Sequence, residues 1–204
     1  MSASAHWTSV YTTKPVTTVS WYQAEAGLSF ELITRHWPDR HAAIIDVGAG
    51  ASVLADALLA AGYADLTLLD IAEPALAETR TRLGPKGDAV TWLAADLLTA
   101  DLPPARYDVW HDRAVFHFLT TPADRARYMS QLSRAVVPGG VVILATFAED
   151  GPERCSGLPV ARYSGEALIA ALGDGFTPLA MQRDVHTTPG GGSQSFNYLV
   201  ATRL

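Results

Sequence analysis

Short apolar runs alternate along the chain with segments whose apolar residues recur at helical spacing. The runs predict strands at 43–47, 65–70, 89–94, 107–111 and 140–147. Helical spacing predicts helices at 52–63, 74–83, 122–137 and 164–172. Strands that are apolar on both faces and alternate with amphipathic helices are typical of a parallel sheet covered on each side. The predicted fold class is therefore α/β.

The last part of the chain has a different pattern. Residues 176–185 and 194–202 are strand-like, and the segment between them contains Pro189 and a run of three glycines, Gly190 to Gly192. Two strand-like runs joined by such a turn favour an antiparallel pair. We expect this pair to form the edge of the sheet.

The first predicted strand runs directly into a glycine turn and then into a helix, in the sequence from Ile44 to Ser52. Gly48 and Gly50 allow the backbone to turn sharply and to approach a ligand with no Cβ in the way. The following helix would point free N–H groups toward that ligand. Dinucleotide-binding folds use the same arrangement, so the glycines alone do not define the ligand.

Three carboxylates and one missing glycine narrow the choice of ligand. Val53 stands where a dinucleotide fingerprint has its third glycine, and Asp46 precedes the turn, where it would repel a pyrophosphate but suit an ammonium group. Asp70 ends the second strand and can accept from both ribose hydroxyls. Asp96 ends the third strand and can accept from an adenine amino group. An ammonium, a ribose and an adenine without pyrophosphate describe S-adenosylmethionine.

With D-x-G-x-G, an acid after the second strand and A-D-L after the third, the chain resembles the class I methyltransferases over roughly residues 40–204. The resemblance implies a doubly wound, mostly parallel seven-stranded sheet in the order 3-2-1-4-5-7-6, with the last strand antiparallel and helices on both faces. It implies S-adenosylmethionine as cofactor and S-adenosylhomocysteine as product. It assigns cofactor contacts to Asp46, Gly48, Ala49, Gly50, Asp70, Ile71, Asp96, Leu97 and Asp112.

The fourth predicted strand ends in His111-Asp112-Arg113, where cofactor and substrate should meet. The segment resembles the W-D-R-G-A-L stretch of thiopurine and related thiol methyltransferases, with His111 inserted and Ala114 in place of glycine. A related acid-Lys-Gly sequence occurs at this point in several protein-lysine methyltransferases.

Three residues of this region are predicted to be catalytic. Arg113 could hold a substrate anion or the cofactor carboxylate, and His111 or His117 could accept a proton. The structural alternatives are an Asp112–Arg113 ion pair and a hydrogen-bonded core histidine at 117. The spacing of His111, Asp112 and His117 matches no metal-ligand pattern, so no metal is expected.

Residues 1–40 precede the first strand and carry the aromatic residues Trp7, Tyr11, Trp21 and Tyr22. We expect this arm to fold over the cofactor as a lid, with Trp21 and Tyr22 in contact with it. The alternative is that the aromatics anchor the arm to the rim of the sheet, and this alternative is favoured for Trp7 and Tyr11. With residues 41–204 as a Rossmann-like core, the whole of 1–204 is expected to form one methyltransferase domain.

Composition removes some classes of partner. The 204 residues include 15 Lys and Arg against 21 Asp and Glu, a formal charge of −6, which argues against a nucleic-acid substrate. Cys155 is the sole cysteine, so no internal disulfide forms. No apolar stretch reaches transmembrane length, and the N-terminal segment does not resemble a signal peptide. We therefore expect a cytoplasmic protein that binds no membrane and is a monomer or weak homodimer.

The functional hypothesis is an enzyme that transfers a methyl group from S-adenosylmethionine to a small molecule, with a thiol or other soft nucleophile favoured. The alternatives are a small-molecule O- or N-methyltransferase, a protein (lysine) methyltransferase, and a non-catalytic S-adenosylmethionine-binding module. The roles of Cys155 and His186 stay open between site and packing.

Overall fold

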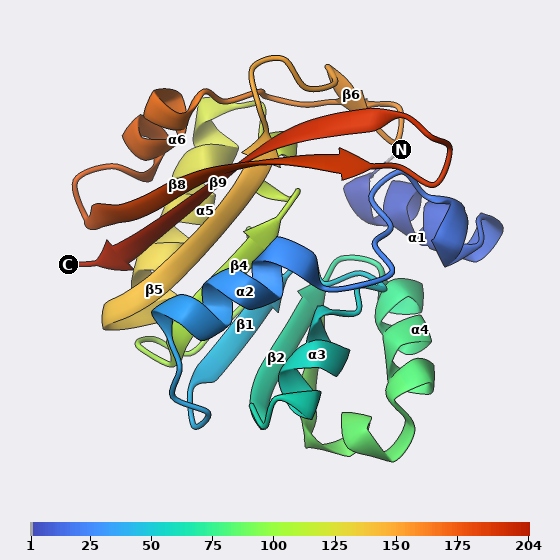
Figure 1. Ribbon diagram of the computed structural model, residues 1–204, viewed down its shortest axis with the longest axis horizontal. Helices are drawn as coiled ribbons and strands as arrows, with labels where there is room; N and C mark the ends of the chain where they lie inside the picture. The colour runs from blue at the N-terminus through green and yellow to red at the C-terminus, as the bar shows by residue number, and fades with distance from the viewer. Residues whose placement is uncertain (1) are drawn as a thin grey trace.

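A seven-stranded sheet in the order β3-β2-β1-β4-β5-β9-β8 forms the centre of the computed structural model, which describes residues 2–204 (Figure 1). Its strands are β1 (Ala43–Val47), β2 (Asp65–Asp70), β3 (Val90–Ala94), β4 (Tyr107–Arg113), β5 (Val136–Phe147), β8 (Phe176–Thr187) and β9 (Ser193–Arg203). β1 to β5 are parallel, whereas β9 is antiparallel to both β5 and β8. The predicted strand order and the antiparallel last strand are confirmed.

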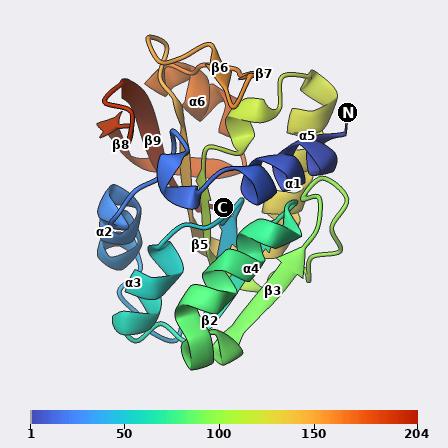
Figure 2. The same cartoon turned by 90° about the vertical axis from the view of Figure 1, so that its right-hand side faces the viewer.

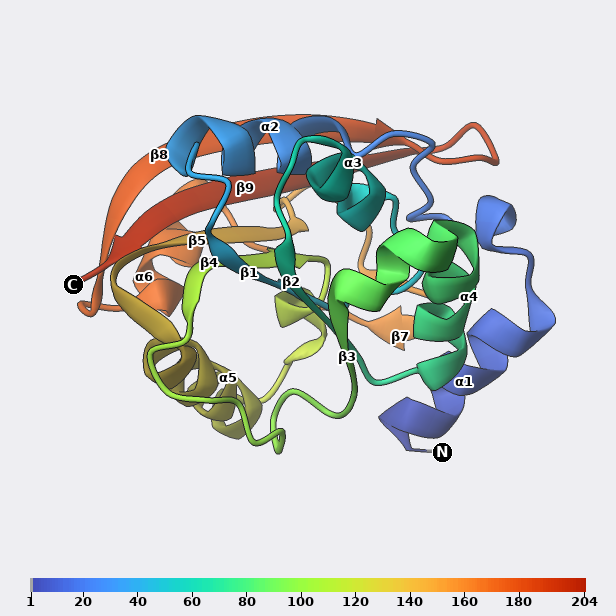
Figure 3. The same cartoon turned by 90° about the horizontal axis from the view of Figure 1, so that it is seen from below.

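Helices cover both faces of the sheet (Figure 3). One face carries α2 (Gly27–His36), α3 (Leu54–Ala60) and α4 (Glu73–Leu83), and the other carries α5 (Pro122–Ala135) and α6 (Gly165–Leu172). The remaining helix, α1 (Ala3–Thr13), packs beside α4 (Figure 2). The short elements are η1 (Val16–Thr18), η2 (Gly84–Ala89), η3 (Phe116–Phe118), β6 (Arg154–Cys155) and β7 (Leu158–Pro159). None of the helices within residues 2–204 is long and apolar enough to cross a membrane.

The inner strands β2, β1, β4, β5 and β9 are mostly buried on both faces, whereas the edge strands β3 and β8 are more exposed. Side-chain alternation divides the core into two layers. Ile44 and Val109 pack in the layer that includes Leu32 and Ile33 of α2, whereas Ile45 and Trp110 pack with residues of α5. Successive strand residues point to opposite faces. The same alternation decides which polar residues at the strand ends can reach a common site.

The helix after the glycine turn is shorter than the predicted 52–63. It begins at Leu54, whose N–H donates to the Ser52 hydroxyl at 3.1 Å, so Ser52 precedes the helix. It ends at Ala60, two residues before Gly62, whose φ of +93° a helix cannot contain.

The boundary between α5 and β5 also differs from the prediction. Val136 pairs with Tyr107, and after an irregularity the ladder resumes with Val109 against Val141. The strand therefore begins at Val136 and not at Gly140, and α5 ends at Ala135 and not at Val137. Thr121, whose hydroxyl accepts from the N–H of Asp124 at 3.1 Å, caps the start of α5.

Candidate active site

The glycine turn after β1 has the backbone geometry that only glycine adopts without strain. Gly48 and Gly50 have φ values of +65° and +53°. A Cβ on Gly48 would lie 2.0 Å from Val115 Cγ2, and one on Gly50 would lie 2.6 Å from the Tyr11 hydroxyl. Val115, from the turn after β4, and Tyr11, from α1, therefore pack directly against this turn, and α1 covers it.

Asp70 ends β2 and braces the same turn. Its Oδ2 accepts from the N–H of Gly50 and its Oδ1 from the N–H of Ala72, each at 2.8 Å. Burial raises the pKa of Asp70 to about 6, and the charge of Asp46 adds to the rise, while the backbone N–H bonds oppose it. The carboxyl group thus lies at the edge of the cavity, already anchored through backbone groups.

Asp46, His111 and Ser29 form a buried hydrogen-bonded line. The parallel register pairs Asp46 with His111, and His111 Nδ1 lies 2.7 Å from Asp46 Oδ1. His111 Nε2 lies 2.9 Å from the hydroxyl of Ser29 in the first turn of α2. All three residues are less than 5% exposed. Both ring nitrogens of His111 are therefore engaged.

Arg113 lies on the same face of β4 and contacts neutral groups. Its Nε donates to the Tyr198 hydroxyl at 3.0 Å, its Nη1 donates to the Trp21 carbonyl at 3.2 Å, and its guanidinium carbon is 4.7 Å from the centre of the Phe196 ring. Its Nη2 is buried and has no partner within residues 2–204, and no carboxylate of that part of the chain forms an ion pair with it. The positive charge is thus uncompensated, and one donor is free.

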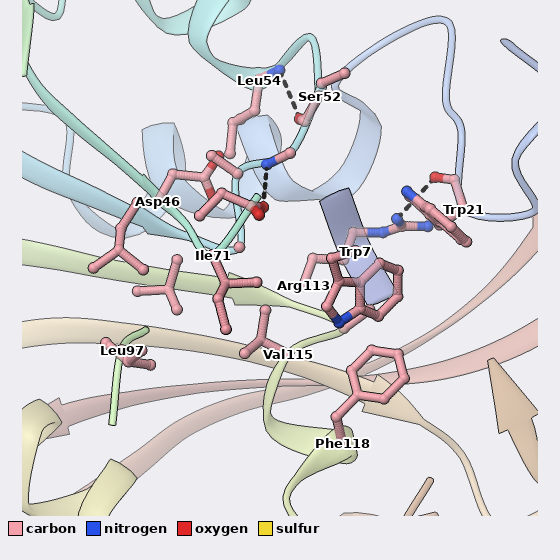
Figure 4. Close-up of a pocket in the computed structure, with 18 of the residues that line it drawn as sticks. Trp7, Trp21, Asp46, Ser52, Leu54, Ile71, Leu97, Arg113, Val115 and Phe118 are labelled. Atoms are coloured by element: carbon pink, nitrogen blue, oxygen red, sulfur yellow. Dashed lines mark hydrogen bonds between the residues drawn. The ribbon is translucent and has the colours of Figure 1, made fainter. Parts of the chain in front are cut away.

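The aromatic residues of the arm form one wall. Trp7 packs edge-on against Trp21 and Phe118, with ring centres 5.6 and 5.1 Å apart, and the Trp21 indole N–H donates to the Tyr11 hydroxyl at 3.1 Å. Figure 4 shows Arg113 extending toward Trp21, with Trp7 beside Phe118. Trp7 and Tyr11 line the cavity as well as packing the arm, so packing alone does not describe them.

These groups enclose one cavity of about 380 Å³. Pockets for small ligands and cofactors span about 300–1,000 Å³. The predicted site residues that line it are Trp21, Tyr22, Asp46, Gly48, Ala49, Gly50, Asp70, Ile71, Asp96, Leu97, His111 and Arg113. Segments from the arm, the ends of four strands (β1 to β4) and the β6–β7 hairpin thus meet at one place.

Asp112 does not belong to this group. Because it alternates with His111 and Arg113, its side chain points to the opposite face of the sheet, where it is fully buried. It accepts from the N–H groups of Val115 and Phe116 and from the Tyr128 hydroxyl, at 2.8, 3.1 and 2.7 Å. The structure therefore places Asp112 outside the cavity as a brace for the turn after β4, and the alternative Asp112–Arg113 ion pair is absent.

His117 is also outside the cavity. It is fully buried in η3, packs edge-on against Phe118 and at a tilt against Phe147, and accepts from the N–H of Phe147 at 3.4 Å. Burial lowers the pKa of His117 to about 3, with a further contribution from the charge of Arg113. An imidazole with this environment stays neutral at physiological pH, and the geometry favours the core-histidine alternative over a proton acceptor.

Cys155 and His186 lie near Arg113. Cys155 lines the cavity, and burial raises its pKa to about 12 despite the nearby Arg113 charge, so the group is a neutral thiol. His186 Nε2 lies 2.9 Å from the carbonyl of Ser20, which links β8 to the arm. Within residues 2–204, no group of three or more His, Cys, Asp or Glu side chains is arranged to hold a metal ion.

Sequence reasoning missed Ser29 and Val115. Ser29 precedes Leu32 and Ile33 by three and four positions, the spacing that puts side chains on one face of a helix. A small polar residue on that apolar face was the available signal. No sequence signal pointed to Val115, because its contact with Gly48 depends on the conformation of the turn after β4.

Comparison with known proteins agrees with this geometry. A family model described as a methyltransferase domain matches residues 44–140. Uncharacterized methyltransferases of Mycobacterium tuberculosis and Mycobacterium bovis are 36% identical over 104 residues, which cover 51% of this chain and 50% of theirs. The chain thus spans about half the length of the curated relatives it matches.

Solved structures extend the comparison to nearly the whole chain. A structure described under the conversion of a disulfide bond into a thioacetal group during echinomycin biosynthesis superposes with a TM-score of 0.81 at 18% identity, covering 99% of this chain and 92% of the other. The Burkholderia thailandensis 1,6-didemethyltoxoflavin-N1-methyltransferase gives 0.72 at 22% identity, covering 98% and 86%. Residues 44–140 thus match a methyltransferase-domain family, and the whole chain has the Rossmann-like fold of the class I methyltransferases.

Proposed function

We propose that the protein binds S-adenosylmethionine in this cavity and transfers its methyl group to a small acidic molecule. The observation that carries the proposal is a cavity with two unlike halves. One half holds the glycine turn and the strand-end carboxylates Asp46, Asp70 and Asp96, and the other holds aromatic side chains around Arg113. The first half suits the cofactor, and the second suits an acceptor.

The residues present fit the cofactor. One oxygen of Asp46 accepts from His111, and no hydrogen bond within residues 2–204 reaches the other, which leaves it available to an ammonium group. Asp70 is held at the turn by backbone groups and retains free lone pairs for ribose hydroxyls. Asp96 and Leu97 line the far end, where an adenine would contact them. When bound, the cofactor supplies an electrophilic methyl group on a sulfonium.

The chain's own residues orient the acceptor and exclude water. Trp7, Tyr11 and Trp21 cover the cavity on the side of the arm, and a covered site keeps water from competing for the methyl group. Arg113 Nη2 is a free, buried, charged donor, and such a donor is costly unless an anion meets it. We therefore place an acidic group of the acceptor, such as a carboxylate, against Arg113.

A thiol or other soft nucleophile is the reacting group we favour. The acceptor half is walled by apolar and aromatic side chains, including Phe118 and Leu158, which suit a poorly hydrated sulfur atom better than a strongly hydrated amine. The structure described under echinomycin biosynthesis concerns sulfur chemistry. A small-molecule oxygen or nitrogen acceptor is the alternative, since the Burkholderia relative acts on a nitrogen of a small molecule.

A protein acceptor is the second candidate. The mouse eEF1A lysine and N-terminal methyltransferase is 21% identical over 150 residues, which cover 71% of this chain and 21% of that protein. An entering polypeptide needs an open groove, whereas α1 lies over the glycine turn here. The covered cavity therefore favours a small acceptor.

The experiment uses methyl-labelled S-adenosylmethionine and matched pairs of acceptors that differ by one carboxylate. The pairs are 3-mercaptobenzoate with thiophenol, 3-hydroxybenzoate with phenol, and 3-aminobenzoate with aniline. We expect the carboxylate-bearing member to be labelled faster, and the sulfur pair to react best. Preferential labelling of cell protein would support the second candidate. Cofactor binding without labelling of any acceptor would indicate a binding module.

A further inference from the structure

The hydrogen bonds that join Ser29, His111 and Asp46 could carry a proton from the Ser29 hydroxyl to the His111 ring, with Asp46 on the far side of the ring. An ionised carboxylate only accepts, so with Asp46 ionised and the ring uncharged, the 2.7 Å contact puts the imidazole proton on Nδ1. Nε2 is then an acceptor, and the Ser29 hydroxyl donates to it across 2.9 Å. The Ser29 oxygen keeps its lone pairs free to accept from another group.

We propose that Ser29, His111 and Asp46 form a proton relay that takes the proton of the methyl acceptor, with Ser29 as the residue that meets it. This proposal rests on the proposed function and deepens it. Each of the three residues lines the cavity, and they come from three separate elements, α2, β4 and β1. Ser29 has no other side-chain hydrogen bond within residues 2–204, and its hydroxyl does not cap or brace α2.

The acceptor atom bonds to the methyl carbon while the carbon–sulfur bond of the sulfonium breaks, and its electron pair stays on sulfur as S-adenosylhomocysteine forms. The acceptor's proton passes to Ser29 Oγ as the hydroxyl proton of Ser29 passes to His111 Nε2. The resulting imidazolium is paired with Asp46 and later loses its proton to water.

Charged groups around His111 act on this step in opposite directions. Asp46, from β1, stabilises the imidazolium, whereas Arg113, two residues further along the same face of β4, opposes it. Asp112 lies on the other face of the strand, and Glu25, just before α2, lines the same cavity. The relay therefore matters most for acceptors that arrive protonated and least for those already ionised.

The test compares Ser29→Ala with Thr34→Ala, a matched control in the same helix. The Thr34 hydroxyl donates to the carbonyl of Phe30 in its own helix, at 3.0 Å, and does not line the cavity. With 3-hydroxybenzoate, whose phenol is protonated at neutral pH, Ser29→Ala should lower kcat by about 10- to 100-fold. With 3-mercaptobenzoate, whose thiol is more acidic, the loss should shrink to less than about threefold as pH rises.

S-adenosylhomocysteine should bind Ser29→Ala, Thr34→Ala and the parent equally. An equal loss of kcat on both acceptors at every pH, or full turnover by Ser29→Ala, would overturn the relay and leave methyl transfer standing. A second readout needs no acceptor: ¹⁵N NMR of the histidine rings should show His111 protonated at Nδ1 and not at Nε2. An Nε2–H tautomer overturns the relay. A parent protein that methylates nothing in the panel overturns the relay together with the proposed function.

Discussion

At the residue scale, Arg113 is the side chain that we propose selects acidic acceptors. Replacing it with Met removes one charge-assisted hydrogen bond, worth about 1.5–3 kcal/mol, or about 10- to 150-fold in kcat/KM for carboxylate-bearing acceptors. Arg113→Lys keeps the charge but loses the planar fork, and its effect should be intermediate. In both variants, the KM of the acceptor should rise. If the KM of the cofactor rises instead, Arg113 holds the methionine carboxylate.

Neutral acceptors such as phenol provide the internal control for Arg113, because they have no carboxylate that could bind the arginine. Arg127→Met, which removes an exposed arginine of α5 paired with Asp124, is the matched surface control and should leave kinetics unchanged. Equal losses on acidic and neutral acceptors in Arg113→Met would mean that the arginine only supports the arm through Trp21 and Tyr198.

Asp70 gives a pH-dependent prediction at the same scale. Its pKa in the folded protein is about 6, above the usual range for an aspartate, so the folded state holds this proton more tightly than the unfolded chain. The stability that this adds is complete below about pH 4 and is lost as pH rises through 6. Asp70→Asn should therefore gain about 2–3 kcal/mol relative to the parent between pH 4 and pH 8.

Urea unfolding at the two pH values measures this difference, and the comparison with the parent cancels groups that titrate in the opposite sense, such as His117. A stability difference that does not change with pH would show that the Asp70 carboxyl is ionised throughout the range. The same variant should bind S-adenosylhomocysteine more weakly at pH 8, because an amide offers one acceptor oxygen where the carboxylate offers two.

At the scale of elements, we expect loss of α1 to reduce turnover more than it reduces folding stability. Most of the core lies between Leu32 and Ala201, whereas α1 contributes the cavity side chains Trp7 and Tyr11. Deleting residues 1–14 should keep the unfolding transition cooperative and lower kcat at least about tenfold as water enters the site. Ser9→Ala, on the exposed side of α1, is the control.

The deletion is measured by thermal unfolding together with methyl transfer to the best acceptor found. Full turnover by the shortened protein would assign Trp7 and Tyr11 to packing alone. Loss of the cooperative transition would show that the arm belongs to the folding unit, and the point variants Trp7→Ala and Tyr11→Phe would then test the lid without removing the helix.

Elements were predicted well where a local pattern decides them. The buried strands β1, β2 and β4 follow from apolar runs, and the starts of α5 and α6 lie within one residue of the helices predicted from 122 and 164. Boundaries set by tertiary contacts were missed, as at Val136, which joins β5 by pairing with Tyr107. The errors at Asp112 and His117 arose because a motif shows which residues are close in sequence but not which face of the sheet each side chain meets.

At the scale of the whole molecule, the sheet order brings distant residues to one edge. Asp46, Asp70 and Asp96 were predictable as a group because the carboxyl ends of parallel strands meet there. Ser29 was not, because its position depends on how α2 packs against β4 across 82 residues of sequence. The half of the cavity proposed for the cofactor could therefore be predicted from motifs at the strand ends. The half proposed for the acceptor could not, because it depends on how the arm packs.

The most direct test of the central claim is a calorimetric titration with S-adenosylhomocysteine. We expect saturable binding of one molecule per chain, weakened about 10- to 150-fold in Asp70→Ala by the loss of about 1.5–3 kcal/mol of hydrogen bonding to ribose. An unchanged dissociation constant in Asp70→Ala would remove that residue from the site. Tighter binding of a nicotinamide dinucleotide than of S-adenosylhomocysteine would contradict the assignment of the cavity to S-adenosylmethionine.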